Sequence, residues 1–232
     1  MTKRADRERK KARRDRGSIT PKQLLDGAFA LAEEVGIDNF SMPSLAKRLD
    51  VGITNIYWHF GRKGALLEAM RDRSVAEFAR STAYGEGDDW RSALSAYATN
   101  AWKTLGANPV MCDLVLSRAP TTSAVAQYGA EDVTKAVADL VDAGLPKADA
   151  WDTVNAVTIH IRGSMLLRRL YDKQFRSDTI GFPAHPEVPA SKADTLDSVP
   201  RRRGIPDDRL FEFGLNCLLD DAERRISDAS TC

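Results

Sequence analysis

The stretch from Thr20 to Arg73 decides the fold of this chain: TPKQLLDGAFALAEEVGIDNFSMPSLAKRLDVGITNIYWHFGRKGALLEAMRDR. Its apolar residues recur at helical spacing, and the pattern is interrupted at Gly36, at Gly52 and at Gly61. It therefore predicts one long helix, then two short helices joined by a tight turn, then the start of a fourth helix.

The expected helix boundaries rest on local signals. Thr20, Pro21 and Gln23 form a Thr-x-x-Gln capping box with proline at the first helical position. Ser41 is a candidate cap for the second helix. Asp50 to Gly52 makes a tight connection to a helix expected from about Ile53 to Phe60. These signals predict a helix-turn-helix.

The two faces of the 53–60 helix differ in chemistry. Ile56 and Phe60 are four residues apart and are expected to pack inward, whereas the N-terminal residues Ile53, Thr54 and Asn55 are free to meet base edges. Asparagine pairs with adenine through two hydrogen bonds, and threonine and isoleucine contact a thymine methyl. This helix is the candidate DNA-reading element.

Residues beside this reading end carry further chemistry. Tyr57 and His59 lie on flanks where they could reach phosphates, and Lys63 adds positive charge at the start of the next helix. The alternative is an aromatic core cluster over residues 57–60. Three consecutive helical residues cannot all point inward, so only Phe60 is assigned to the core. The other candidate DNA contacts are Ser41, Ser44 and Trp58.

At these residues the chain resembles the tetracycline-repressor (TetR) family. The matching pattern is Leu45-Ala46-x-x-Leu49-x-Val51-x-x-x-x-Ile56-Tyr57-x-His59-Phe60-x-x-Lys63-x-x-Leu66-Leu67. The Tyr-Trp-His triplet is similar to the tetracycline-responsive branch, and residues 210–220 resemble that branch's final helix. Pro43 stands where many members have an arginine that contacts DNA, and Asp50 replaces the usual glycine.

The resemblance implies a homodimer that binds double-stranded DNA at a palindromic operator. It also implies a helical C-terminal body for a small-molecule effector. By the same resemblance, Ile53, Thr54 and Asn55 take the base-reading positions, and Tyr57, His59 and Lys63 take phosphate or support positions.

Charge is distributed unevenly along the chain. Residues 1–73 carry 16 Lys/Arg against 10 Asp/Glu, and the remainder carries 18 against 23. A basic segment before an acidic body fits a protein that meets phosphate at one end. Residues 1–17 are expected to be a flexible solvated tail, with an additional DNA-contacting arm as the alternative.

The remainder of the chain predicts helices only. They are expected at about 90–105, 109–118, 121–143, 147–171 and 207–228, with a flexible loop at 172–206 that contains Pro183, Pro186, Pro189 and Pro200. The predicted class is all-α, with a DNA-binding domain at 18–73 and a ligand-binding and dimerisation domain at 74–232.

The segment Trp151–Tyr171 is apolar on more than one side, and residues 207–228 are similar. We expect these two helices to pair with their symmetry mates in a dimer. Polar Asn155, Thr158 and Arg162 lie in one stripe and could orient an apolar ligand; the alternative is an ordinary paired arginine and a satisfied asparagine. The full set of candidate ligand contacts is Trp102, Met111, Tyr128, Trp151, Asn155, Thr158, Arg162 and Met165.

Composition limits the other functions. Three widely spaced cysteines and the lack of a long apolar run favour a cytoplasmic protein without membrane attachment. Neither a zinc motif nor a glycine-rich phosphate loop occurs, so we expect no metal, no cofactor and no enzyme activity. The leading interpretation is a ligand-released repressor, and the alternative is a DNA-binding regulator or activator that needs no ligand.

Overall fold

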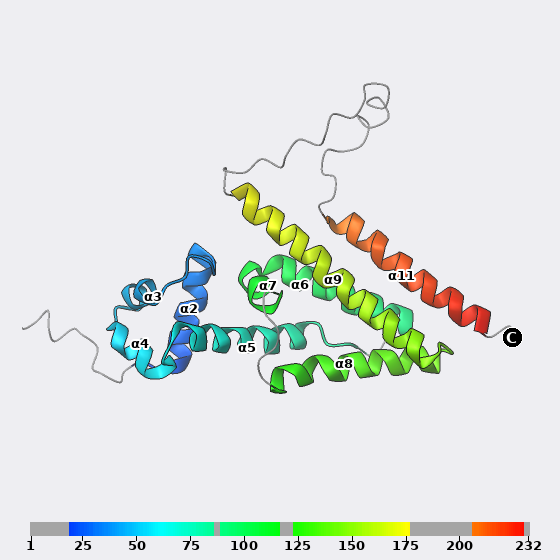
Figure 1. Ribbon diagram of the computed structural model, residues 1–232, viewed down its shortest axis with the longest axis horizontal. Helices are drawn as coiled ribbons and strands as arrows, with labels where there is room; N and C mark the ends of the chain where they lie inside the picture. Colours follow the sequence, from blue (N-terminus) through cyan, green and yellow to red (C-terminus); the bar gives the residue numbers. More distant parts are fainter. Residues whose placement is uncertain (1–18, 86–88, 117–122, 177–205, 230–232) are drawn as a thin grey trace, which may run out of the picture. The chain divides into compact units, whose positions relative to one another are not determined.

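The computed structural model describes residues 19–85, 89–116, 123–176 and 206–229. Within these residues every regular element is an α-helix, so the predicted all-α class is confirmed (Figure 1). The helices are α2 (Pro21–Val35), α3 (Met42–Leu49), α4 (Ile53–Phe60), α5 (Lys63–Ser81), α6 (Trp90–Ala107), α7 (Pro109–Leu116), α8 (Ser123–Asp142), α9 (Lys147–Arg176) and α11 (Asp208–Ala229). The predicted tail at 1–17 lies outside the described residues.

The chain divides into two compact units. The first contains Met1–Arg80 and Ala107–Gly129, and the second contains Ser81–Gly106 and Ala130–Cys232. In the first unit α7 packs with the N-terminal helices and contacts α2.

The core of the first unit forms where α2, α3 and α4 meet. Leu24, Leu45 and Ile56 contribute one fully buried side chain from each helix. Leu66 and Met70 of α5, and Val110 and Leu114 of α7, belong to the same cluster. Burial of this apolar surface is the main force that holds the short helices together.

A glycine allows α2 and α3 to approach closely. A Cβ atom at Gly27 would lie 2.6 Å from Leu49 Cδ2, closer than real side chains approach. The missing side chain therefore makes room for Leu49, which packs against the core from α3.

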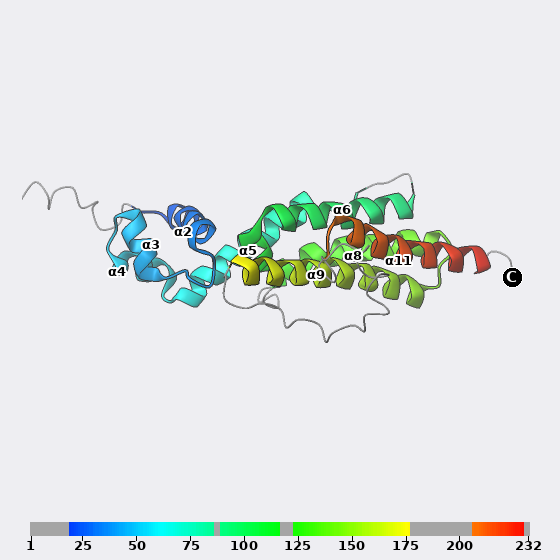
Figure 2. The same cartoon turned by 90° about the horizontal axis from the view of Figure 1, so that it is seen from above.

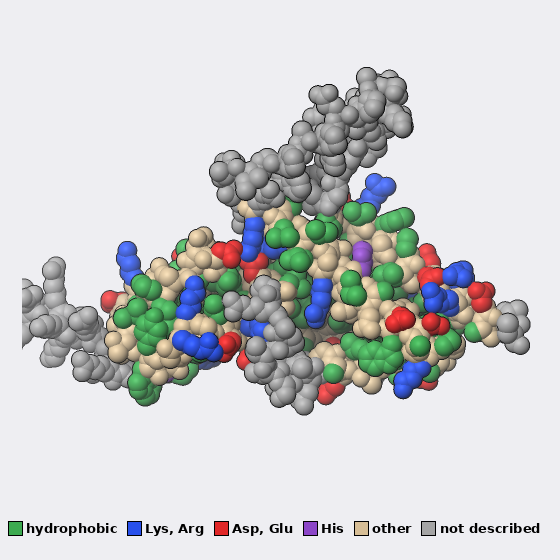
Figure 3. All heavy atoms as spheres, viewed as in Figure 1, with side chains coloured by type: hydrophobic (Ala, Val, Ile, Leu, Met, Phe, Trp, Pro, Cys, Tyr) green, Lys and Arg blue, Asp and Glu red, His purple; other side chains and the backbone are tan. Residues whose placement is uncertain are grey.

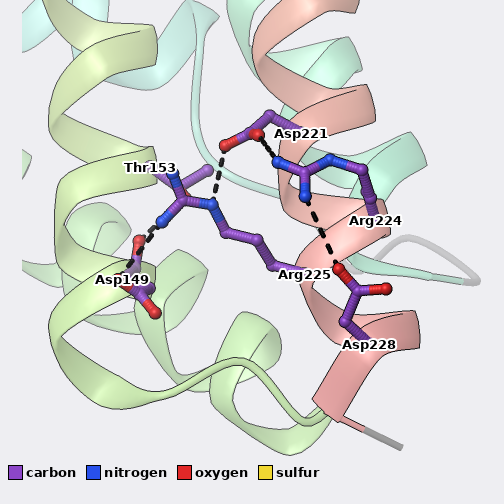
Figure 4. A network of polar contacts seen from close by, with 6 residues as sticks. All are labelled: Asp149, Thr153, Asp221, Arg224, Arg225 and Asp228. Atoms are coloured by element: carbon purple, nitrogen blue, oxygen red, sulfur yellow. Dashed lines mark hydrogen bonds and ion pairs between the residues drawn. The ribbon is translucent and has the colours of Figure 1, made fainter. Parts of the chain in front are cut away.

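In the second unit α11 lies along α9, as the views in Figures 1 and 2 both show. Val157 of α9 and Leu215 and Leu219 of α11 are buried. At one end of the pair, Arg225 of α11 joins Asp149 of α9 at 3.3 Å and Asp221 of its own helix at 2.8 Å (Figure 4). Apolar contact and ion pairs thus act on the same two helices.

One predicted boundary is wrong. The loop expected at 172–206 begins later, because α9 continues to Arg176. Tyr171-Asp-Lys-Gln-Phe-Arg contains no glycine or proline, so nothing in the local sequence ends the helix there. Residues 177–205 lie outside the described residues.

Candidate DNA-binding site

The turn between α3 and α4 is built from local hydrogen bonds. The Ser41 hydroxyl accepts a bond from the Ser44 backbone N–H at 3.2 Å and caps α3. At the other end of α3, Asp50 adopts φ 51°, the left-handed conformation that glycine takes most easily and that aspartate tolerates. Val51 N–H then donates to the Ala46 carbonyl at 3.1 Å and closes the turn.

The inner face of α4 holds the helix in place. Ile56 is completely buried, and Phe60 packs, half-buried, on the same core. Leu49 and Val51 contribute further apolar contact. This packing fixes which side chains point away from the core.

The outer face of α4 exposes large side chains to solvent. Trp58 is 79% exposed, Tyr57 42% and Ile53 37%; Thr54 is also exposed, and Asn55 is half-buried. Trp58 contacts the His59 ring edge-on at 4.6 Å. Ile53, Tyr57 and Trp58 together place apolar surface on the outside of α4, and an exposed apolar patch of this kind marks a candidate contact surface.

His59 and Lys63 form internal contacts in this structure. His59 Nε2 lies 3.0 Å from the Ile19 carbonyl oxygen, and it is the donor because a carbonyl only accepts. Lys63 Nζ donates to the Phe40 carbonyl at 2.5 Å. Both side chains therefore tie α4 and the start of α5 to the segments that flank α2.

The candidate DNA contacts predicted from the sequence did not include Lys47, a positively charged residue of α3. Lys47 lies one turn after Ser44 on the exposed side of α3, and no ion-pair partner is found for it among the described residues. Arg48, its neighbour, pairs with Glu34 at 2.5 Å. The sequence signal for Lys47 was its spacing, because it lies three residues after Ser44 and therefore on the same side of α3.

Comparison with known proteins agrees with this geometry. Residues 24–70 match the family "Bacterial regulatory proteins, tetR family", and residues 84–226 match the "Tetracyclin repressor-like, C-terminal domain". The chain belongs to the TetR family. It is thus a DNA-binding transcriptional regulator with a helix-turn-helix, as its sequence predicted.

Relatives extend over nearly the whole chain. The HTH-type transcriptional repressor Rv1353c of Mycobacterium tuberculosis is 45% identical over 95% of this chain and 87% of its own length. The class A tetracycline repressor from transposon 1721 of Escherichia coli is 28% identical over 90% and 93%. The crystal structure of TetR from Acinetobacter baumannii AYE has a TM-score of 0.63 at 25% identity and covers 89% of this chain and 98% of that one.

The predicted ligand contacts of this TetR-family chain lie in different environments. Trp102 and Met165 are buried in the second unit, whereas Met111 is buried in the first. Trp151, Asn155 and Arg162 are exposed, and the Tyr128 side chain lies outside the described residues.

Three residues of the second unit, Thr158, Trp102 and Tyr97, have polar interactions that bear on a ligand site. The Thr158 hydroxyl donates to the Val154 carbonyl at 2.9 Å. Trp102 stacks on Phe211 at 4.4 Å and donates from Nε1 to Asp208 Oδ1 at 2.8 Å. Burial is the main cause that raises the pKa of Tyr97, and the Asp132 charge raises it further, whereas the Arg162 charge opposes the rise.

No helix in the described part of the chain combines the length and the apolar character that crossing a bilayer requires.

Proposed function

We propose that this protein is a homodimeric repressor that binds a palindromic operator in the cytoplasm and is released from it by a small, largely apolar ligand. The domain at 18–73 would bind DNA, and the domain at 74–232 would bind the ligand and form the dimer. In this proposal the protein binds DNA and ligand and catalyses no reaction.

The observation that carries the proposal is the division of α4 into two faces. Ile56 anchors the helix, while Ile53, Thr54 and Tyr57 are exposed along it. A short helix held in this way can enter the major groove and offer its N-terminal residues to base edges. Asn55 would add adenine recognition, and Trp58 would contact the backbone or a thymine methyl.

The dimer is supported by an apolar surface on α9 and α11. Hydrophobic side chains lie at the surface over both helices (Figure 3). Phe213 is 67% exposed and Ile159 is 69% exposed. The further exposed members of this surface are Leu166, Leu167, Leu170 and Leu210. A second copy of the chain would bury this surface by two-fold symmetry and place two copies of α4 on one operator.

Effector release is supported by the chemistry of the second unit. Trp102 and Met165 supply buried apolar surface in this unit, and Trp102 Nε1 donates to Asp208 Oδ1 at 2.8 Å. A ligand that binds better to one conformation of this unit would change the separation of the two α4 helices. Since successive major grooves on one face of DNA lie about 34 Å apart, a changed separation would remove one of the two α4 helices from its half-site.

Operator selection tests the proposal. Random DNA duplexes are incubated with the purified protein at two salt concentrations, and the bound fraction is sequenced. The proposal predicts an inverted repeat with half-sites about one helical turn or slightly more apart. Salt-sensitive binding without an enriched sequence would contradict it.

The oligomeric state is tested separately. Light scattering is expected to show a dimer for the parent chain and a monomer for Phe213→Asp, which places a charge in the apolar surface. Glu212→Gln, at the neighbouring exposed position on α11, is the control and should stay dimeric. Once the operator is known, a ligand screen for its release separates the repressor proposal from a regulator that needs no ligand.

A further inference from the structure

Two adjacent cations, Arg62 and Lys63, lie at the corner where α4 ends and α5 begins. Gly61 ends α4 with φ 64°, and Arg62 N–H donates to the Phe60 carbonyl at 2.6 Å, so the chain turns sharply before α5 starts. Trp58, which is exposed on the outer face of α4, lies one turn before this corner. The corner therefore borders the surface that is proposed to contact DNA.

The two cations have different partners. Lys63 Nζ donates to the Phe40 carbonyl at 2.5 Å, so its ammonium is bound to the backbone of the first unit. The Arg62 side chain is 72% exposed, and its Nη2 donates to Glu68 Oε1 at 3.2 Å. Turning toward solvent would cost Lys63 a bond to the backbone, whereas it would cost Arg62 only an exposed ion pair, which contributes little to stability.

A glycine makes room for the position of the Arg62 side chain. A Cβ atom at Gly64 would lie 2.9 Å from Arg62 Nη1, so the guanidinium occupies space that a side chain at this position would fill. Gly64 lies in the first turn of α5, and Glu68 lies one turn further along the same helix. The Arg62 side chain is thus folded back along α5, away from the end of α4.

Glu68 and a DNA phosphate would compete for the same guanidinium. Carboxylate and phosphate both accept paired hydrogen bonds from arginine. Duplex DNA carries one negative charge per about 1.7 Å of its axis, and each phosphate that a cation neutralises also releases counterions. The Glu68 carboxylate is 42% exposed and offers a single, solvent-screened charge. A phosphate beside this corner would therefore displace Glu68 from Arg62.

We propose that Arg62 is a phosphate-binding residue of the DNA interface, and that Glu68 keeps its side chain folded back along α5 when DNA is absent. The inference rests on the proposed function, because it requires DNA to lie on the outer face of α4. It assigns the phosphate contact at this corner to Arg62, with Lys63 bound to the fold. A phosphate contact strengthens binding to every duplex alike and leaves the sequence preference unchanged.

Salt-dependent DNA binding tests the role of Arg62. Kd is measured for the selected operator and for a scrambled duplex, with the full-length parent and with Arg62→Gln, at several salt concentrations. Arg62→Gln is expected to raise both Kd values about tenfold, and to reduce the salt slope for the operator by about two, one for each subunit of the dimer. Parent-like Kd and slope in Arg62→Gln would overturn this inference, whereas a parent without preference for any duplex would overturn the proposed function instead.

A double-mutant cycle distinguishes release of Arg62 from simple repulsion between Glu68 and DNA. Glu68→Gln is expected to lower both Kd values about threefold, because the guanidinium is then free before DNA binds. In the Arg62→Gln background the same change should leave Kd nearly unchanged. Absence of a gain in the parent background, or an equal gain in both backgrounds, would overturn the role assigned to Glu68.

Asp26→Asn is the matched control for Glu68→Gln. Asp26 forms an ion pair with Arg73, and both side chains are about half exposed. Arg73 lies nearly three turns beyond the start of α5, about 15 Å along the helix axis. The control therefore also frees an arginine from a carboxylate, but away from α4, and its Kd values should stay within about twofold of the parent. A gain equal to that of Glu68→Gln would show that affinity follows net charge alone and would overturn the inference.

Discussion

The α3–α4 region and the α9–α11 pair are stabilised in different ways. In the first, local hydrogen bonds fix both ends of α3. Ser44 N–H donates to the Ser41 hydroxyl at its start, and Val51 N–H donates to the Ala46 carbonyl at its end. In the second, two long helices meet over a broad surface, with His160 stacked on Phe211 at 5.0 Å. Structure is specified by nearby residues in one region and by distant residues in the other.

This difference determines where substitutions should act. A short helix such as α4 has too few residues to be stable alone, so it depends on one or two buried anchors. The long helices spread their contacts, and a single surface ion pair contributes little there. Four substitutions, taken from the largest expected effect to the smallest, test this comparison.

Ile56→Ala should have the largest effect. Ile56 is fully buried in the core of the first unit, and removing its side chain leaves a cavity, so the free energy of unfolding should fall by about 3 kcal/mol. Urea denaturation measures this loss. Thr54→Ala, an exposed change on the same helix, should stay within about 0.5 kcal/mol of the parent, and equal losses in both variants would refute the anchor role.

Gly214→Ala should separate α9 from α11. A Cβ atom there would lie 2.5 Å from His160 Cε1, and we expect a loss of about 1–3 kcal/mol in the free energy of unfolding. The control is Gly129→Ala in α8, where nothing lies within 4 Å and the better helix propensity of alanine should instead stabilise by up to about 1 kcal/mol.

The Gly214 result can be traced to His160 by a double-mutant cycle. If the clash causes the loss, Gly214→Ala should be much less harmful in a His160→Ala background. Stabilisation by Gly214→Ala in the parent, as at Gly129, would show that the helices do not approach each other in this way.

Thr20→Ala should have a moderate effect on α2. The Thr20 hydroxyl accepts from Gln23 N–H at 3.2 Å, and Thr20 N–H donates to Gln23 Oε1 at 3.0 Å, so the substitution breaks the capping box and should cost about 1 kcal/mol in thermal or urea unfolding. Thr134→Ala is a control because that hydroxyl only bonds back to the Ala130 carbonyl within α8. A larger loss at Thr134 than at Thr20 would contradict this reasoning.

Asp221→Asn should have the smallest effect, and the effect should depend on pH. The hydrogen bond from Arg224, with the nearby charge of Arg225, lowers the pKa of Asp221 (Figure 4). A lowered pKa in the folded state means that the carboxylate stabilises the protein above its unfolded pKa, and that this contribution is lost as the pH falls through the folded value.

The measurement for Asp221 is the unfolding midpoint at two pH values. Asp221→Asn should lower Tm slightly at pH 7, by no more than about 2 °C. Below the lowered pKa the parent and variant should unfold together, since the parent carboxyl is then neutral. A difference that grows at acidic pH would show that the ion pairs are not its source.

Sequence predictability follows the same division between regions. The capping box at Thr20, the turn conformation at Asp50 and the α4 boundaries were confirmed, because each depends on residues a few positions apart. The packing of α7 with the first unit was not anticipated, because it depends on contacts between segments far apart in the chain. For the same reason, the sequence could not show that Met111 and Met165 belong to different units.

The candidate DNA contacts divide in a similar way. The outward position of Tyr57 follows from helical periodicity once Ile56 is placed inside. The bonds from His59 to Ile19 and from Lys63 to Phe40 join residues that are far apart in the sequence, so the sequence alone could not predict them.

The central claim is that the exposed face of α4 reads DNA while its buried face holds the helix. The most direct test measures Kd for the selected operator and for a scrambled duplex with the parent, Asn55→Ala and Tyr57→Ala. We predict that Asn55→Ala lowers the ratio of operator to scrambled affinity, whereas Tyr57→Ala weakens binding to both duplexes alike. Parent-like affinity and preference in both folded variants would contradict the claim.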